Sequence, residues 1–188
     1  DLGDTGVDDV AYLTEVIDDV ASKYSVDPAR VFFVGHSNGG FMSHRMACDR
    51  ADRVAAIVSL AGAVWADPAE CQPASPVAVL HVHGDDDMTI VYDGGQIAGD
   101  PYPSALETVS TWADKNGCAG ELEPTAVRLD LDQGLEADET RVARFADCPG
   151  SSAEVELWPI EGGSHVPGLV QPGWPEAIVD FLLAHPKQ

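Results

Sequence analysis

The chain has 188 residues, with 10 Lys and Arg against 32 Asp and Glu, and its formal net charge is −22. A negative charge this large repels phosphate backbones and anionic lipid surfaces, which argues against nucleic-acid binding and against a membrane partner. No stretch approaches the roughly 20 apolar residues that a membrane-spanning helix needs. The length predicts one domain, residues 1–188, with a substantial core.

The first expected element is a helix over residues 7–24. Apolar residues recur there at helical spacing, and most of the acidic residues fall on the other face. The predicted inward stripe comprises Val7, Val10, Ala11, Thr14, Ile17, Val20, Ala21 and Tyr24. Asp4 or Thr5 would cap this helix at its start.

The clearest chemical signal follows a predicted strand at residues 31–34. The strand leads into GHSNG at residues 35–39, a GxSxG pattern centred on Ser37, and a helix is expected over 39–49. A serine hydroxyl is a weak nucleophile, and a tight strand-to-helix turn holds it clear of the backbone beside a base. We expect such a turn to tolerate only small flanking residues, which Gly35 and Gly39 supply.

Asn38 is the candidate for oxyanion stabilisation. Its N–H and the start of the following helix would face the carbonyl oxygen on which negative charge develops during acyl transfer. The pattern alone is weak evidence, because a Gly-rich turn between a strand and a helix also produces it. The neighbouring elements and the candidate partners of Ser37 therefore decide its meaning.

The rest of the chain alternates strands with helices. Strands are expected at residues 54–60, 77–82 and 155–160, and helices at 104–116 and 174–184. In the helix 104–116, the residues expected to face inward are Leu106, Val109 and Trp112. Strands that are apolar on both faces predict a mostly parallel α/β sheet. Residues 118–148 differ, because the runs 126–131 and 140–145 alternate apolar with polar residues, which predicts an antiparallel excursion at the sheet edge.

The four cysteines indicate disulfides and an oxidising compartment. They are Cys48, Cys71, Cys118 and Cys148. None has the CxxC or Cys/His spacing of a zinc or thioredoxin-type site, so no metal is expected. Four cysteines allow three pairings, of which we favour neighbour pairing, Cys48 with Cys71 and Cys118 with Cys148. The alternative is four buried free thiols in a cytosolic protein.

The partners of Ser37 should lie in loops that follow strands, because reactive groups of open α/β sheets collect at the carboxyl ends of the strands. His165 follows the last strand and is the candidate base. Asp85, Asp86 and Asp87 follow the strand 77–82, and we choose Asp87, three residues after Gly84, as the acid that orients the histidine. The order Ser, Asp, His is the one expected of an α/β-hydrolase.

The other five histidines are expected to be structural. His81 and His83 belong to a strand and His44 to a helix, His36 should face away from its neighbour in the turn, and His185 should lie at a frayed terminus. Trp65 and Met88, in loops beside the predicted site, are candidate substrate contacts, although plain packing explains them equally well.

Several motifs together resemble the secreted polyhydroxybutyrate depolymerase and feruloyl esterase group of α/β-hydrolases. They are GHSNGG (35–40), HVHG (81–84) with Asp87, YDGG (92–95), Trp112 with NGC (116–118), and EGGSH (161–165) with Pro167 and Gly168. The resemblance implies carboxylester hydrolysis without a cofactor, with Ser37 as nucleophile, Asp87 as orienting acid and His165 as base. It also implies the cysteine pairing favoured above and a secreted or periplasmic protein.

The chain departs from that group in two places. The loop 162–168 lacks the family's Trp, and Val91 stands where proline is common, so the ester remains open: polyester, feruloyl, acetyl or a small ester. The family also begins with several strands and a loop carrying a second oxyanion N–H, which we expect this chain to lack. A non-catalytic ester- or glycan-binding module on a truncated hydrolase fold is therefore the alternative, and a peptidase or acyltransferase would use the same three residues.

Overall fold

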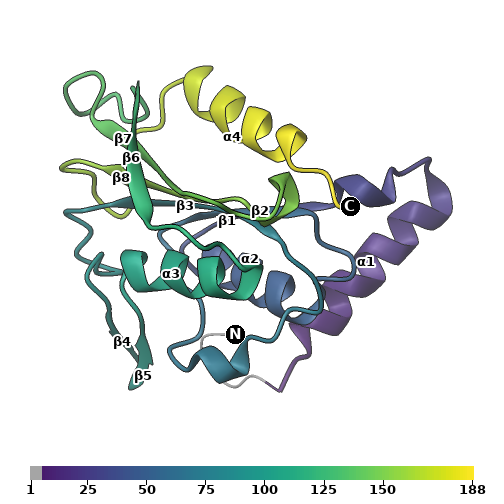
Figure 1. The fold of residues 1–188 in the computed structure, drawn as a ribbon. Helices are drawn as coiled ribbons and strands as arrows, with labels where there is room; N and C mark the ends of the chain where they lie inside the picture. The colour runs from purple at the N-terminus through teal and green to yellow at the C-terminus, as the bar shows by residue number, and fades with distance from the viewer. Residues whose placement is uncertain (1–5) are drawn as a thin grey trace.

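A six-stranded sheet forms the middle layer of the molecule (Figure 1). The structure is a computed structural model that describes residues 6–188. The strand order is β1-β2-β3-β8-β7-β6. The strands are β1 (Phe32–His36), β2 (Ala56–Leu60), β3 (Ala78–Gly84), β6 (Leu122–Leu129), β7 (Thr140–Phe145) and β8 (Val155–Ile160). The first four in spatial order are parallel and the last two antiparallel, which confirms the predicted mostly parallel α/β fold.

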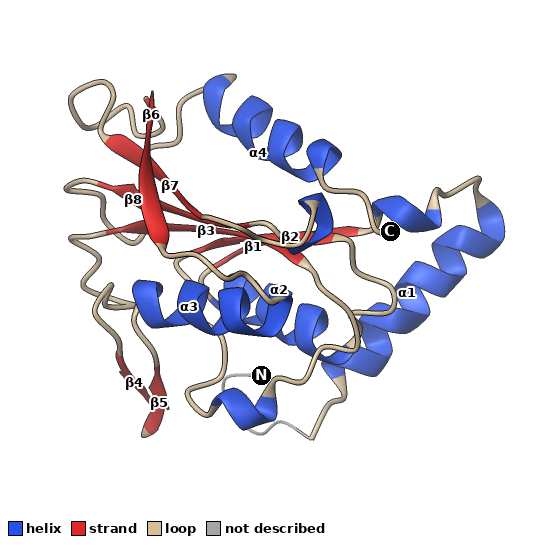
Figure 2. Cartoon of the chain, in the orientation of Figure 1, coloured by secondary structure: helices blue, strands red, loops and turns tan. Residues whose placement is uncertain are grey.

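Helices cover both faces of this sheet (Figure 2). On one face lie α1 (Asp9–Lys23), α2 (Asn38–Asp49) and α3 (Ala105–Asn116), and on the other lies α4 (Gly173–Ala184). Three short 3-10 helices, Pro28–Arg30, Pro68–Glu70 and Ser151–Ala153, occupy connections. A small hairpin of β4 (Gly95–Ile97) and β5 (Asp100–Tyr102), absent from the sequence prediction, forms a separate sheet.

The central strands are continuous apolar runs in the sequence because they are buried on both faces. Every residue of β2, β3 and β8 is buried, because helices cover both of their faces. In α3, Val109 and Trp112 are fully buried as predicted. Leu106 is 50% exposed, so its predicted inward position is wrong. It lies next to Ala105, the residue that turns inward at the start of the helix.

Helix α1 is more exposed than its apolar stripe predicted. It begins at Asp9, and the Asp8 side chain caps it by accepting a bond from the Ala11 N–H at 2.9 Å. The expected caps, Asp4 and Thr5, lie outside the described residues. Only Val10, Leu13 and Ile17 pack against the core. The stripe residues Val7, Ala11, Val20, Ala21 and Tyr24 are exposed, because α1 packs mainly against α2 and lies on the outside of the fold (Figure 1).

Between residues 118 and 148, two antiparallel strands extend the sheet beyond β8 to its edge. β7 pairs with β8 and β6 with β7, with an irregularity between Pro124 and Arg128. β6 spans Leu122–Leu129 rather than the predicted 126–131, because the strand begins soon after the Cys118–Cys148 disulfide joins the two ends of the excursion. Both predicted pairings are confirmed, since Cys48 bonds to Cys71 as well.

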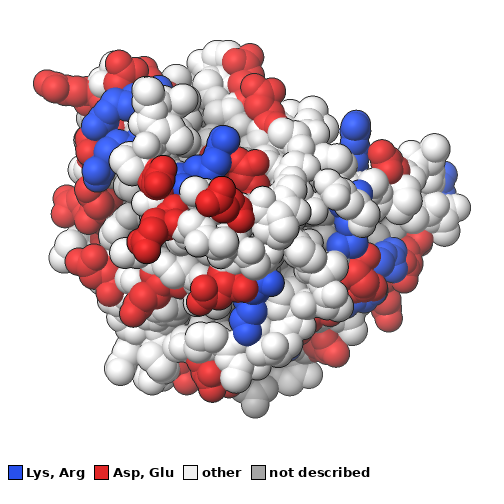
Figure 3. Space-filling view, viewed as in Figure 1, with Lys and Arg blue, Asp and Glu red and all other residues white. Residues whose placement is uncertain are grey.

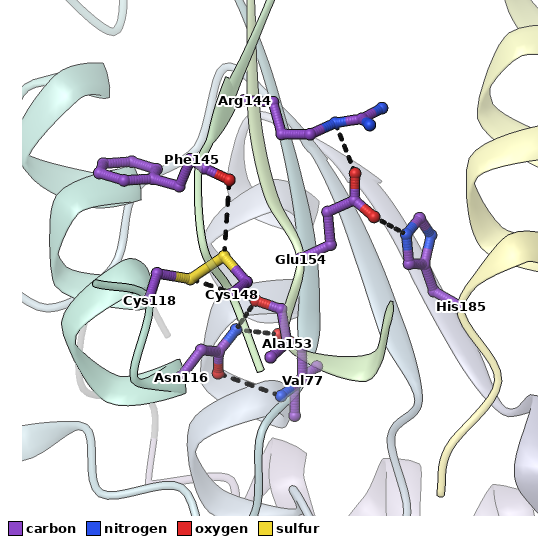
Figure 4. The surroundings of a disulfide bond; sticks show 9 residues. All are labelled: Val77, Asn116, Cys118, Arg144, Phe145, Cys148, Ala153, Glu154 and His185. Carbon is purple, nitrogen blue, oxygen red and sulfur yellow. Dashed lines mark hydrogen bonds and ion pairs between the residues drawn. A yellow bond between two sulfur atoms is a disulfide. The ribbon is translucent and has the colours of Figure 1, made fainter. Parts of the chain in front are cut away.

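Figure 4 shows how the base of this excursion is anchored. The Asn116 side chain, at the end of α3, donates to the carbonyls of Val77 at 2.8 Å and Ala153 at 3.0 Å, and accepts from the Val77 N–H. Val77 and Ala153 lie just before β3 and β8, so the sheet does not supply partners for these backbone groups, and the Asn116 side chain does. The end of α3 is thereby fixed against the residues that precede both strands.

The C-terminal histidine is not frayed. His185 is 4% exposed, and its Nε2 lies 2.9 Å from a carboxylate oxygen of Glu154, which forms an ion pair with Arg144 (Figure 4). Its Nδ1 donates to the Phe181 carbonyl. Burial alone would lower the pKa of His185, but these two bonds and the nearby carboxylates outweigh it and raise the pKa.

The surface carries the strong negative charge of the sequence. Figure 3 shows acidic side chains spread over the visible face, with the few basic ones lying beside them. Within residues 6–188, no helix is long and apolar enough to cross a membrane.

Candidate active site

Three strands deliver the predicted site residues to one place. Ser37 follows β1, Asp87 lies in the turn after β3, and His165 lies in the loop after β8. The Ser37 hydroxyl lies 2.9 Å from His165 Nε2, and His165 Nδ1 lies 2.7 Å from Asp87 Oδ2. Because a carboxylate only accepts, Nδ1 carries the ring proton, which leaves Nε2 as the acceptor for the serine. The structure therefore brings together all three residues in the predicted order.

The turn at Ser37 has the strained geometry expected of an exposed nucleophile. Ser37 has φ 55° and ψ −121°, a conformation that non-glycine residues rarely adopt. A Cβ at Gly35 would lie 2.0 Å from the Gly39 carbonyl oxygen, so Gly35 is required. A Cβ at Gly39 would meet nothing within 4 Å, and the predicted steric need for glycine there is wrong. In α2, glycine is needed one residue later, because a Cβ at Gly40 would lie 3.1 Å from the backbone of Gly62.

Helix α2 begins at Asn38, directly after the serine. The first four N–H groups of a helix have no partner within it, so the Asn38 N–H is available at the positive end of α2 beside the Ser37 hydroxyl. This is the position expected of an oxyanion donor. The residues before β1 within 6–31 form α1 and a 3-10 helix but no strand, so the described chain has no counterpart there to the family's strands and second-donor loop.

Asp87 is held in place by its own turn. Its Oδ1 accepts from the N–H groups of Thr89 at 2.7 Å and Ile90 at 2.9 Å, and its side chain is fully buried. Burial opposes ionisation, but the bond from His165 and the two backbone bonds outweigh it and lower the pKa of Asp87. A buried carboxylate that stays ionised can hold an imidazolium beside it. The neighbouring Asp85 and Asp86 are exposed.

Glycine contacts set the distance between the acid loop and the histidine loop. A Cβ at Gly84 would lie 2.2 Å from the Gly163 carbonyl oxygen, so the two backbones touch. The Asp86 N–H donates to that carbonyl at 3.0 Å, and the Asp85 carboxylate accepts from the Gly162 N–H at 2.6 Å. Asp85, rejected as the catalytic acid, therefore binds the two loops together.

A second contact, missed in the sequence, holds the far side of the histidine loop. Asp132 is 6% exposed, and its Oδ1 accepts from the N–H groups of Gly134 and Gly168, both at 2.9 Å. The Gln133 N–H donates to the Gly168 carbonyl at 2.9 Å. The turn between β6 and β7 thus fixes the backbone three residues after His165, a role that the acidic DQG sequence alone does not reveal.

His36 contacts the histidine loop, which the sequence did not predict. Its Nε2 lies 2.6 Å from the backbone carbonyl of His165, and the two rings are 4.8 Å apart. The alternation of side chains along a strand places His36 opposite Gly35, but the strand ends at His36 and its ring turns toward the histidine loop. The long separation in sequence between residues 36 and 165 hid this contact.

The two predicted substrate contacts have different environments. Trp65 lines a pocket of about 420 Å³ together with Phe41, Arg45 and Tyr102, and the Arg45 guanidinium lies 5.1 Å from the Trp65 ring. Phe41 follows Ser37 by one turn of α2, so this pocket lies near the nucleophile but is not lined by it. Met88 is 84% exposed and lines neither this pocket nor its neighbour beyond Trp65. Across residues 6–188, no group of three or more His, Cys, Asp or Glu residues could hold a metal ion.

The sheet topology and the strand-end positions of Ser37, Asp87 and His165 define the α/β-hydrolase class. Residues 5–114 match the family model described as Phospholipase/Carboxylesterase, which is more than half of the chain. The chain belongs to this family. Among solved structures, an acetyl xylan esterase from Aspergillus awamori has a similar fold, with a TM-score of 0.63 and 16% identity over 93% of this chain and 67% of that one.

Curated relatives are similar over nearly the whole chain. Feruloyl esterase B from Piromyces equi is 31% identical over 90% of the chain, and feruloyl esterase C from Emericella nidulans is 29% identical over 96%. The putative esterase NocK from Nocardia uniformis is 29% identical over 93%. The matches span 31%, 59% and 57% of those relatives in the order given, so this chain corresponds to only part of each.

Proposed function

We propose that the chain is a serine carboxylesterase that works through an acyl-enzyme intermediate. The observation that carries this proposal is the hydrogen-bond path from Ser37 through His165 to Asp87, with distances of 2.9 and 2.7 Å. Ser37 Oγ attacks the ester carbonyl carbon while its proton passes to His165 Nε2. Asp87 keeps His165 in the required tautomer and stabilises the imidazolium, and the Asn38 N–H donates to the oxyanion.

The second half of the reaction uses the same groups. His165 returns its proton to the leaving alkoxide, which departs as the alcohol and leaves the acyl group on Ser37. A water molecule then gives a proton to His165 and attacks the acyl carbon, and the acid is released as His165 returns that proton to Ser37 Oγ. Apart from the ester and water, every step uses groups of the chain itself, and the proposal includes no metal or cofactor.

The relatives support an ester of the feruloyl or acetyl class as the substrate, whether polymeric or small, since their names refer to feruloyl and acetyl xylan esterases. A polyhydroxyalkanoate or another polyester belongs to the same proposal. Two disulfides support a secreted or periplasmic protein, because such bonds persist in oxidising compartments. We also propose that residues 1–188 act as one domain, with residues 118–148 as an excursion from it.

The alternative is a non-catalytic module that binds an ester or glycan. The observation that favours it is that the Asn38 N–H is the one oxyanion donor identified beside Ser37 within residues 6–188. Removing one oxyanion donor costs about a hundredfold or more in rate. This alternative predicts ligand binding without turnover that depends on Ser37.

Intact-mass analysis after treatment with an organophosphonate separates the two. The expected result is one adduct per chain, absent from Ser37→Ala and His165→Ala, followed by turnover of feruloyl or acetyl esters. No adduct on a chain that circular dichroism shows to be folded would contradict the hydrolase proposal and leave the binding module. Turnover of peptides or transfer to alcohols in preference to hydrolysis would point to a peptidase or an acyltransferase.

A further inference from the structure

Three buried histidines lie outside the path from Ser37 to Asp87. His81 and His83 project from β3 and His44 from α2, and each is at most 2% exposed. The rings of His81 and His83 are 5.4 Å apart, and those of His44 and His81 are 5.6 Å apart. Burying a polar ring is unfavourable unless its nitrogen atoms find partners, so the partners of this layer indicate what it does.

The neighbours of His83 determine which of its nitrogen atoms carries hydrogen. Nε2 lies 2.8 Å from the Ile90 carbonyl oxygen, which can only accept, so Nε2 carries the proton. Nδ1 is then an acceptor, and it lies 3.3 Å from His81 Nε2, which must donate. His81 therefore donates to His83, and His83 donates to the Ile90 carbonyl. We call these two linked hydrogen bonds the histidine array.

Burial keeps these rings neutral, so the direction is fixed. It lowers the pKa of His81 well below 6.5, and the neighbouring histidines lower it further. Burial also lowers the pKa of His83, although the bond to Ile90 and the Asp87 carboxylate oppose the change. A neutral imidazole has one donor and one acceptor, which is the pattern that His83 requires.

His83 contacts both ends of the turn that holds the acid. Besides bonding the Ile90 carbonyl, its Nε2 lies 3.4 Å from Asp87 Oδ2, the oxygen that accepts from His165 Nδ1. The Ile90 N–H in turn donates to Asp87 Oδ1. If His83 lost its Nε2–H, a lone pair would face both the Ile90 carbonyl and the carboxylate, and the turn would have to move.

We propose that His83, oriented by His81, is a positioning residue that holds the Asp87 carboxylate against His165. The inference rests on the proposed esterase function, because it assigns a role within the same site. The array ends at His81: in residues 6–188, neither His81 Nδ1 nor His44 Nε2 has a hydrogen-bond partner. His44 and its partner Trp112, whose Nε1–H donates to His44 Nδ1 at 2.9 Å, therefore lie outside the array.

Two substitutions at His83 and a control test this role in the full chain. His83→Phe removes the donor, and we expect kcat to fall about a hundredfold with little change in KM, because a misplaced Asp87 misplaces His165. His83→Gln keeps a side-chain N–H that can reach Ile90 and should recover about tenfold of that loss. Trp112→Phe changes the same buried layer outside the array and controls for core disruption. A His83→Phe variant as active as Trp112→Phe would overturn the proposal.

Nitrogen-15 NMR of the histidine rings gives a readout that does not depend on turnover. In the unsubstituted chain at about pH 8, above the range in which an ordinary histidine titrates, His81 and His83 should both show the Nε2–H tautomer. An Nδ1–H tautomer or an imidazolium at His83 would overturn the proposal. If the chain proves inactive, the esterase function fails separately, and the His165 Nδ1–H resonance still reports positioning: it should persist in Trp112→Phe and shift or vanish in His83→Phe.

Discussion

The Nε2–H of His36 donates to the backbone carbonyl of His165 at 2.6 Å, so the residue before the nucleophile holds the residue that would activate it. The carbonyl belongs to the histidine loop, and the two rings lie 4.8 Å apart. Ser37 and His165 come from loops that are far apart in the sequence, and this bond is a direct link between them besides their own hydrogen bond.

We expect His36→Phe to lower kcat by about tenfold while leaving the melting temperature nearly unchanged. His36 is exposed, so the fold does not depend on it, but the loss of one hydrogen bond lets the His165 loop drift from its productive position. His36→Gln, which retains an N–H donor, should keep most of the activity. The measurement is kcat on a chromogenic ester beside thermal unfolding. An unaltered kcat in the phenylalanine variant would show that the bond does not position His165.

The two glycines of the serine turn should respond differently to alanine. Gly35→Ala places a methyl group 2.0 Å from the Gly39 carbonyl and should destabilise the protein by about 2 kcal/mol or more. Gly39→Ala meets no neighbour and lies in a helix, where alanine is favoured, so it should gain about 0.5 kcal/mol. Urea unfolding of both variants measures the difference. Equal destabilisation would contradict the geometry of the turn.

Asp132→Ala should loosen the histidine loop from the β6–β7 turn. The Gly134 and Gly168 N–H groups lose their acceptor, at a cost of about 2 kcal/mol, and kcat should fall with it. Asp132→Asn keeps the accepting oxygen and should retain activity. The exposed neighbour Asp130 provides the control, since Asp130→Ala should change neither stability nor kcat. Amide hydrogen exchange at Gly168 measures the loosening directly, and unchanged protection in Asp132→Ala would refute it.

His185 and Glu154 should make stability depend on pH within a defined window. The folded pKa of His185 is raised above 6.5, so its contribution is fully present below pH 6.5 and is lost as the pH rises through the folded value. The hydrogen bond from His185 lowers the pKa of Glu154 below 4.5, so that contribution is present above pH 4.5 and is lost as the pH falls through the folded value. The pair therefore stabilises the chain most between these two values.

His185→Gln tests that window. The charged hydrogen bond to Glu154 contributes about 2 kcal/mol at pH 6, and the variant should lose it there but lose less near pH 9. Free energies of unfolding measured at both pH values give the comparison. A loss of the same size at both would mean that His185 contributes through packing and not through its charge.

The predictable part of this molecule is the part encoded by local pattern. Continuous apolar runs predicted the strands of the parallel sheet, and GxSxG predicted the turn at Ser37, because backbone geometry there depends on adjacent residues. His165 and Asp87 were predicted because parallel strands end at one edge, so loops after strands meet. That rule gives the neighbourhood of the acid, and the resemblance to esterases supports Asp87 over its two acidic neighbours.

What the sequence did not reveal depends on contacts between distant segments. The exposure of Val20 on α1 and of Tyr24 directly after it follows from how little the fold packs against that helix, which periodicity does not report. The roles of His36 and Asp132 each require knowing which backbone atom lies opposite, in a distant segment of the chain. The role of His83 requires knowing the path of the turn that follows its strand. The buried position of His185 likewise depends on Glu154, 31 residues earlier.

The loops that carry Asp87 and His165 are joined through main-chain atoms at Gly84 and Gly163 and through the Asp85 carboxylate, which accepts from the Gly162 N–H. Met88 and Val166, the residues directly after Asp87 and His165, are 84% and 72% exposed and take no part in that join. Both side chains are open to solvent beside the residues proposed to react. The two positions are therefore suited to a combinatorial library, in which side chains near the proposed site vary while the contact between Gly84 and Gly163 that spaces the two loops is preserved.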